Sequence, residues 1–366
     1  MSGITVDDKH RLALVDALRC FACFWVVLFH LSEGNHIPTL LAAIPGWLKY
    51  MVFDAGHLGV PIFFVLSGIV MATTTSRVPM NNVNATNFVA RRLVRLAPPY
   101  YAAIALGVAV IAVKHMLGQP GIEIPGVTAI LAHVLFLQDF LGIRNIITVF
   151  WTLCIEVQFY IFFAVLLWLA DRAGEGVTPK RRNLWIWGSA LLALLWPAGI
   201  IHAIGWKGGF IAFWFSFMAG VLCAQTLSGT KQSHYIAIGY CALALVIGLA
   251  TKNSFTIAAG LTGLLFCFLV NRSTTLGFIS SYPVQKIALI SYSLYLFHSP
   301  VTGFFMRVYR AFMPTGLFSD ALAAVLIIAT CIAFSAMAYL MFERPAIAWS
   351  RRIKFKRPDA VVLNRT

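Results

Sequence analysis

Ten apolar runs of about 17 or more residues divide this 366-residue chain. A helix of that length crosses the hydrocarbon layer of a bilayer, because it rises about 1.5 Å per residue and the layer is about 30 Å thick. Only 11% of the residues are charged, whereas a soluble domain carries about a quarter. The sequence therefore predicts an all-α integral membrane protein, a polytopic transmembrane helix bundle of about ten spans. The runs cover residues 12–32, 57–75, 96–115, 149–170, 184–201, 209–226, 235–250, 255–270, 286–305 and 319–342.

The positions of Lys and Arg predict how these helices are oriented. With ten spans and a cytoplasmic N-terminus, 20 of the 28 basic side chains lie on the cytoplasmic side, seven lie on the other side, and Arg19 lies within the first span. This asymmetry follows the positive-inside rule and predicts that both termini are cytoplasmic. The net charge of +15 collects at the ends of the runs, which indicates contact with membrane lipid and not with nucleic acid. An eleventh run, residues 127–141, is short and polar enough to be interfacial or re-entrant.

The first run places polar side chains inside lipid, between Leu14 and His30. Arg19 and His30 are separated by about three helical turns, or roughly 16 Å, so they share one face. Asp16 lies one turn before Arg19, where it is placed to neutralise that charge. Two interpretations stay open: a functional pair, or charges at the interface with His30 marking the end of the span.

Three arginines precede the third run, namely Arg91, Arg92 and Arg95. Anchoring at the cytoplasmic interface is enough to explain them. Arg92 and Arg95, however, are spaced i,i+3 on one helical face, which suits forked hydrogen bonds to a phosphate-rich ligand. The spacing alone leaves both interpretations open.

A polar stripe marks the fourth run, where Thr152, Glu156 and Tyr160 are spaced by four residues. A carboxylate about two turns inside a span is unfavourable unless it faces a cavity or a partner, so a functional role for Glu156 is the first hypothesis. Packing against a neighbouring helix is the alternative. Residues 59–68, GVPIFFVLSG, place small residues at both ends of an aromatic core, which favours close helix approach over chemistry.

A second histidine lies in the ninth run, where Ser291, Tyr295 and His298 share a face. A single membrane histidine is often only hydrogen-bonded to a neighbouring helix. With the predicted orientation, however, His298 and His30 lie at similar depth in the outer half of the membrane. Two histidines and a glutamate at comparable depth favour a shared site.

Taken in order, these motifs resemble the acyltransferase-3 family of integral membrane O-acyltransferases. The resemblance extends over about residues 12–346 and includes the final Glu343 and Pro345. The chain departs from the family where Ala17 and Cys20 replace frequent glycines and Phe297 replaces a frequent Trp. The other residues that carry the resemblance are Arg19 with His30, GVPIFFVLSG at 59–68, Arg92 and Arg95 followed by proline and tyrosine, FWTLCIEVQFY at 150–160 and SYSLYLFH at 291–298.

The resemblance implies a transmembrane domain over residues 1–346, followed by a basic cytoplasmic tail over 347–366. It also implies transfer of an acyl group, usually acetyl from acetyl-CoA, to a hydroxyl of a surface or lipid-linked carbohydrate. The expected setting is a bacterial inner membrane, and the expected chemistry needs no metal. The expected catalytic residues are Arg19, His30, Glu156 and His298, and the expected contacts to coenzyme A are Arg91, Arg92 and Arg95.

The mechanism expected from these residues has His30 as the general base, because an imidazole with a pKa near 6.5 can accept the proton of an attacking hydroxyl. Glu156 or His298 would orient that imidazole or bind sugar hydroxyls. A covalent acyl-enzyme is less favoured, because no serine is visibly paired with a base. Two alternatives remain: acylation of a small molecule such as a macrolide, and a proton-coupled transporter of lipid-linked sugars, although no internal repeat supports a transporter.

Overall fold

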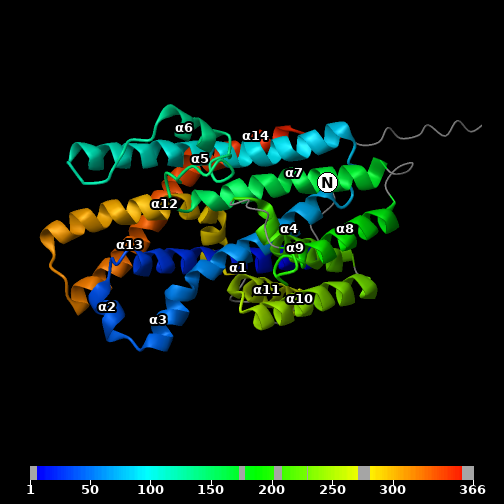
Figure 1. Ribbon diagram of the computed structural model, residues 1–366, viewed down its shortest axis with the longest axis horizontal. Helices are drawn as coiled ribbons and strands as arrows, with labels where there is room; N and C mark the ends of the chain where they lie inside the picture. The colour runs from blue at the N-terminus through cyan, green and yellow to red at the C-terminus, as the bar shows by residue number, and fades with distance from the viewer. Residues whose placement is uncertain (1–5, 173–177, 202–207, 229, 271–280, 357–366) are drawn as a thin grey trace, which may run out of the picture.

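The computed structural model is helical, as predicted, and describes residues 6–172, 178–201, 208–228, 230–270 and 281–356 (Figure 1). The α-helices are α1 (Val6–Glu33), α2 (Pro38–Ala43), α3 (Gly46–Val52), α4 (Gly59–Thr75), α5 (Asn82–Met116), α6 (Val127–Val134), α7 (Phe150–Arg172), α8 (Pro179–Ala193), α9 (Trp214–Gln225), α10 (Lys231–Thr251), α11 (Ser254–Leu269), α12 (Tyr282–Phe312), α13 (Leu317–Ala338) and α14 (Arg344–Arg352). Shorter helical segments are η1 (Asp54–Leu58), η2 (Phe210–Phe213), η3 (Thr226–Ser228) and the π-helical η4 (Tyr339–Glu343).

Among the described residues, six helical segments are long and apolar enough to cross a membrane. They are Ala13–Glu33, Gly46–Thr75, Asn82–Met116, Phe150–Arg172, Lys231–Thr251 and Leu317–Arg352. Every one of the ten predicted runs contains a helix, but α8, α9 and α11 have 15, 12 and 16 residues and are short for a span. Helix α12 is long enough, but its serine, tyrosine and histidine side chains lower its apolarity. The chain is an integral multi-pass membrane protein, and the number ten remains a prediction.

The short run at 127–141 forms α6, whose eight residues rise only about 12 Å and cannot cross the membrane. Its His133 has a structural role. The Nδ1 of His133 donates to the carbonyl oxygen of Ala129 (2.7 Å), and its Nε2 accepts from the backbone N–H of Ile146 (3.1 Å). Burial lowers the pKa of His133, which favours the neutral ring that this acceptor role requires.

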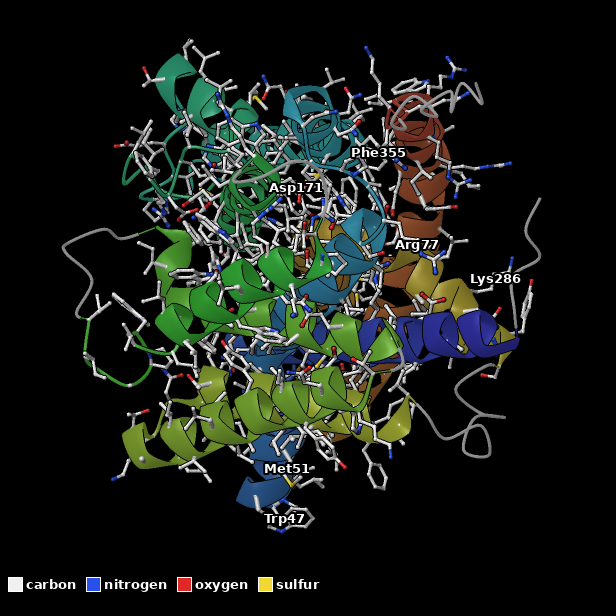
Figure 2. The ribbon with its side chains drawn as sticks, turned by 90° about the vertical axis from the view of Figure 1, so that its right-hand side faces the viewer. Trp47, Met51, Arg77, Asp171, Lys286 and Phe355 are labelled. Atoms are coloured by element: carbon white, nitrogen blue, oxygen red, sulfur yellow. The ribbon has the colours of Figure 1, made fainter. Side chains whose placement is uncertain are left out.

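Helix α1 lies in the middle of the bundle, in contact with α4 and α12 (Figure 1). Helices α5 and α7 lie side by side along one edge, and α10 and α11 pair along the opposite edge. Seen from the end at which α5 begins, Phe355 lies beside α5, whereas Trp47 and Met51 of α3 project away from the bundle (Figure 2). This arrangement places α1 where its polar residues meet those of the surrounding helices.

Two glycines allow α4 and α9 to touch backbone to backbone. A Cβ on Gly220 would overlap the carbonyl oxygen of Val65, and one on Gly68 would overlap that of Phe217. The close approach predicted from residues 59–68 is therefore present, and its partner is α9. This contact fixes the position of α4 beside the cavity described below.

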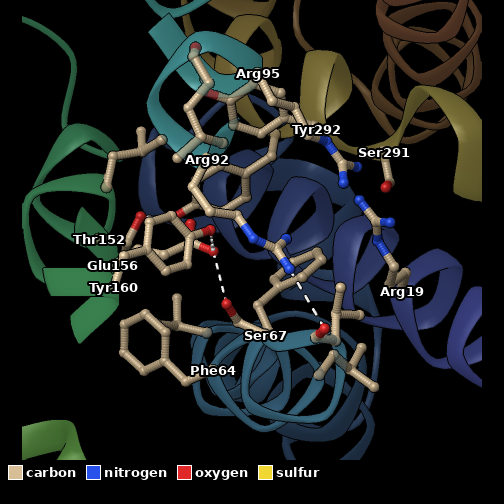
Figure 3. Close-up of a pocket in the computed structure, with 17 residues that line it drawn as sticks. Arg19, Phe64, Ser67, Arg92, Arg95, Thr152, Glu156, Tyr160, Ser291 and Tyr292 are labelled. Carbon is tan, nitrogen blue, oxygen red and sulfur yellow. Dashed lines mark hydrogen bonds between the residues drawn. The ribbon is translucent and has the colours of Figure 1, made fainter. Parts of the chain in front are cut away.

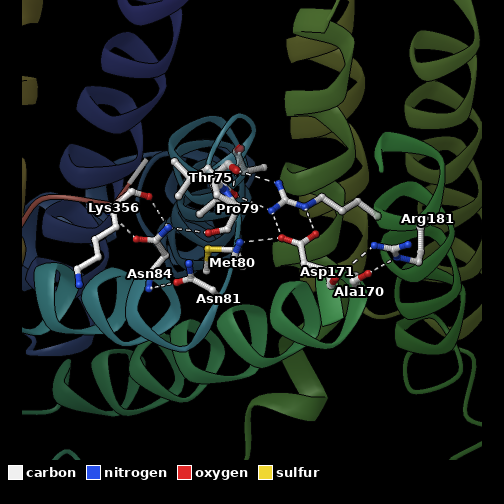
Figure 4. Close-up of polar contacts among 12 residues, drawn as sticks. Thr75, Pro79, Met80, Asn81, Asn84, Ala170, Asp171, Arg181 and Lys356 are labelled. Carbon is white, nitrogen blue, oxygen red and sulfur yellow. Dashed lines mark hydrogen bonds and ion pairs between the residues drawn. The ribbon is translucent and has the colours of Figure 1, made fainter. Parts of the chain in front are cut away.

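A buried ion pair joins the ends of α4, α7 and α8 (Figure 4). Arg182 donates to the carboxylate of Asp171, with Nε 2.6 Å from Oδ1, and also to the carbonyl oxygens of Thr75 (3.1 Å) and Val78 (2.6 Å). The other oxygen of Asp171 accepts from the N–H of Met80 (2.7 Å), just before α5. One carboxylate thus fixes where α5 begins relative to α7.

Candidate active site

One cavity opens between α1, α4, α5, α7 and α12 (Figure 3). The space inside it that a water-sized sphere can occupy is about 110 Å³. Its polar lining comes from five helices that are distant in sequence. The polar residues are Arg19, Ser67, Arg92, Arg95, Thr152, Glu156, Tyr160, Ser291, Tyr292 and Tyr295. Three predicted site arginines and the predicted glutamate therefore face one space.

The three arginines of α5 do not share a role. Arg92 and Arg95 line the cavity, and Arg92 donates to the carbonyl oxygen of Val70 (3.3 Å). Arg95 makes no hydrogen bond or ion pair within the described residues, so its guanidinium is available to a ligand. Arg91 lies outside the cavity, with its guanidinium over the ring of Phe355 at 4.9 Å. The two arginines that the i,i+3 spacing groups are thus the two of this cluster that line the cavity.

Arg19 enters the cavity from α1. Figure 3 shows its guanidinium pointing toward that of Arg95, close to Ser291. The predicted contact with Asp16 is not formed within hydrogen-bond or ion-pair distance among the described residues. Two guanidinium groups that face each other across a cavity repel each other, and an anion between them would relieve that repulsion.

Glu156 faces the cavity and accepts two hydrogen bonds from neighbouring hydroxyls. Ser67 Oγ donates to Glu156 Oε1 (2.8 Å), and the hydroxyl of Tyr160 donates to the same oxygen (2.5 Å). Sequence reasoning predicts the stripe of Glu156 and Tyr160 but misses Ser67, which comes from α4 and is 89 residues away. A serine is therefore paired with a carboxylate here, contrary to the sequence-based expectation.

Tyr295 and Thr152 both line the cavity, and their hydroxyl oxygens lie 2.8 Å apart. Both side chains are buried, and the ring of Phe63 packs edge-on against Tyr295. Beyond Tyr295, at a ring distance of 6.1 Å, lies His298. The cavity and the predicted histidines are therefore neighbours separated by one tyrosine ring.

His30 and His298 form a pair whose ring centroids are 5.0 Å apart. The Nδ1 of His298 lies 2.8 Å from the carbonyl oxygen of Tyr295, and because a carbonyl only accepts, this nitrogen carries the hydrogen. The Nε2 of buried His298 is then a lone-pair acceptor, and it has no partner in the described residues. The predicted proximity of the two histidines is present.

His30 is oriented by a residue that the sequence-based prediction leaves out. The Nδ1 of His30 lies 2.6 Å from Oε2 of Glu33. A carboxylate at this nitrogen holds the hydrogen on Nδ1 and leaves Nε2 as the basic nitrogen. Glu33 lies three residues after His30 on α1, so the i,i+3 spacing could have identified it. Neither Glu156 nor His298 orients the imidazole of His30 in this arrangement.

Comparison with known proteins identifies the family to which this chain belongs. Residues 12–340 match the family model described as an acyltransferase domain, Acyl_transf_3. The chain belongs to the acyltransferase-3 family. It is thus a membrane acyltransferase, which favours the enzyme over the transporter. No solved structure matches the chain significantly.

Two curated proteins are similar to this acyltransferase-3 member. The "Putative membrane-bound transacylase BcsY" of Komagataeibacter xylinus is 24% identical over 363 residues, which covers 94% of this chain and 85% of that protein. The "Regulator of hypoxia-inducible factor 1" of Caenorhabditis elegans is 28% identical over 216 residues, which covers 55% of this chain. The match spans only 42% of the length of the nematode protein.

Proposed function

We propose that this acyltransferase-3 member moves an acetyl group from acetyl-CoA to a hydroxyl of a surface or lipid-linked carbohydrate, with His30 as the general base. The observation that supports this function is the continuity of the site. Three arginines and Tyr295 line one cavity, and the ring of Tyr295 lies beside the imidazole of His298, which is paired with that of His30. A long donor with an anionic end and a reactive far end matches such a site.

The arginine end of the cavity suits the phosphates of coenzyme A. Arg92 and Arg95 supply forked donors, and Arg19 adds a third positive charge from α1. The pantetheine arm would continue past Ser67 and Glu156, whose polar atoms can hydrogen-bond its amides. On helical geometry, Arg19 and His30 are roughly 16 Å apart, a span that suits the extended arm of the donor.

At the histidine end, the reaction requires one base and one oriented acceptor. Nε2 of His30 takes the proton of the acceptor hydroxyl while its oxygen attacks the thioester carbonyl. The new C–O bond forms, the C–S bond breaks, and the imidazolium returns the proton to the departing thiolate sulfur. Glu33 stabilises the transient imidazolium, and the free Nε2 of His298 accepts a hydrogen bond from a second acceptor hydroxyl.

The proposed topology has ten spans, with both termini in the cytoplasm of a bacterial cell and the chain in its inner membrane. The charge asymmetry of the sequence supports this orientation. Arg92 and Arg95 then lie toward the cytoplasm, where acetyl-CoA is available. His30 lies toward the outer face, where a glycan or its lipid-linked precursor can be reached.

The experiment measures release of free coenzyme A from acetyl-CoA by purified protein, with a crude pool of bacterial surface glycans as the acceptor. We expect release that depends on the pool and disappears in His30→Ala. His115→Ala is the matched control, because His115 is exposed at the end of α5. Unchanged release in His30→Ala would exclude His30 as the base. Release with a macrolide but not with the glycan pool would replace the carbohydrate with a small-molecule acceptor.

A further inference from the structure

The first turns of α5 carry two sets of polar side chains that have different partners. Arg92 and Arg95 face the cavity. Asn84, Asn87 and Arg91 are spaced i, i+3 and i+7, so they lie within about 60° of one another around the helix, because consecutive residues are rotated by about 100°. None of these three side chains lines the cavity. Their shared partner is the segment that follows α14, residues 353–356, which we call the strap.

The strap is hydrogen-bonded to α5 through its backbone (Figure 4). The Nδ2 of Asn84 donates to the carbonyl oxygen of Lys356 (2.9 Å), and the N–H of Lys356 donates back to Oδ1 of Asn84 (2.7 Å). One turn later, Nδ2 of Asn87 donates to the carbonyl oxygen of Lys354 (3.0 Å). These bonds use the backbone of the strap, so they do not depend on its lysine side chains.

Phe355 supplies the side-chain contact between the strap and α5. Its ring is half-buried and lies 4.9 Å from the guanidinium carbon of Arg91. An arginine over an aromatic ring contributes about 0.5–1 kcal/mol at exposed sites and more when water is excluded. Arg91, which the sequence predicts to be a donor contact, therefore contacts the strap.

Two prolines interrupt the backbone hydrogen bonding of α5 between the part held by the strap and the rest of the helix. Pro98 and Pro99 follow directly after the cavity-lining arginines. Proline has no N–H, so the carbonyl groups of Val94 and Arg95 lose their usual helical donors. Kinks and hinges in long helices form at such positions. Residues 82–97 can therefore shift relative to 100–116 unless tertiary contacts hold them, and the strap adds to the bonds that Met80 makes with Asp171 and Leu96 makes with Tyr292.

We propose that the strap holds the inner half of α5, residues 82–97, in the position in which Arg92 and Arg95 line the cavity. Phe355 is thus a positioning residue for donor binding. The strap proposal rests on the proposed function for one point, which is that the ligand is an acyl-CoA donor. Releasing the strap lowers the fraction of molecules with correctly placed arginines and raises the apparent Kd in proportion.

Two measurements on full-length Phe355→Ala test the strap: binding of coenzyme A, and hydrogen exchange of backbone amides. We expect faster exchange in residues 84–97, unchanged exchange in 100–116, and a Kd for coenzyme A raised about three- to tenfold. Asn87→Ala provides a second, milder variant with changes in the same direction. The matched control is Lys354→Ala with Lys356→Ala, which removes two charges but keeps the backbone hydrogen bonds and is expected to change neither readout.

Unchanged exchange in residues 84–97 of both Phe355→Ala and Asn87→Ala would overturn the strap. A Kd raised as much by the lysine pair as by Phe355→Ala would also overturn it, because charge attraction would then explain the effect. If the wild type binds no coenzyme A, the proposed donor fails and exchange alone decides. Faster exchange then supports the strap, and unchanged exchange contradicts it.

Discussion

Glu33 determines which nitrogen of His30 can act as a base. Its Oε2 lies 2.6 Å from Nδ1, and the Glu33 side chain is 51% exposed. A half-exposed carboxylate stabilises a neighbouring imidazolium less than a buried one, because solvent screens the pair. In the proposed mechanism, Glu33 should therefore assist the reaction without being indispensable, whereas His30 should be indispensable.

Glu33→Gln tests this division of roles. Glutamine keeps the size of the side chain but loses its charge. We therefore expect the turnover number to fall about 10- to 100-fold, which is at most the lower end of what a general base itself contributes. The KM for acetyl-CoA should stay unchanged, because Glu33 does not line the cavity. Steady-state kinetics on purified protein give both values. A loss as complete as in His30→Ala would contradict an assisting role.

Removing the cavity arginines should change the KM for acetyl-CoA, which removing the charge of Glu33 should not. Arg92→Ala with Arg95→Ala should raise the KM for acetyl-CoA at least about tenfold, because each lost charge-assisted hydrogen bond is worth about 1.5–3 kcal/mol. Arg77→Ala is the matched control, since Arg77 is exposed near the same end of the bundle but outside the cavity. An equal effect in Arg77→Ala would mean that the arginines act only through general positive charge.

Helical spacing predicts side chains that share a face, and it predicts little about their partners. It correctly groups Arg92 with Arg95 and places Glu156 on a polar stripe, because both relations are local to one helix. The bond between Ser67 and Glu156 joins two helices, and no pattern within either run encodes it. The contact of Arg91 with Phe355 is not predicted for the same reason, because Phe355 comes from the other end of the chain.

Helices α4 and α9 are in contact because Gly68 and Gly220 remove the side chains between them. The apolar runs predict most of the long helices of the structure, since length and apolarity are read directly from sequence. They do not predict α2 and α3, or the end of α8 at Ala193, since short helices depend on the packing around them. The pairing of α4 with α9 likewise follows from how closely their backbones can approach, and the spacing of apolar residues does not predict it.

Gly220→Ala should destabilise the protein by about 1–3 kcal/mol or prevent folding, because the added methyl group overlaps the carbonyl oxygen of Val65. Gly239→Ala is the matched control: a Cβ at Gly239 of α10 meets no atom within 4 Å. Alanine favours a helix over glycine, so this control should be neutral or slightly stabilising. Thermal unfolding in detergent compares the two. Equal midpoints would contradict the backbone contact.

The orientation of the whole molecule can be tested at the two ends of α10. Lys231 and Lys252 are both exposed and lie at opposite ends of this helix. With cytoplasmic termini, a membrane-impermeant maleimide should label Lys252→Cys in intact cells and should not label Lys231→Cys until the cells are opened. The reverse pattern would invert the topology and place the arginine end of the cavity outside the cell.

The proposed function makes the cavity and the histidine pair the two ends of one path across the bundle. Proteoliposomes with a single protein orientation test it directly, with radiolabelled acetyl-CoA supplied only on the side of the C-terminal tail and glycan acceptor only on the other. We expect label on the acceptor in the wild type and none in His30→Ala. Transfer only when donor and acceptor share one side of the membrane would contradict it.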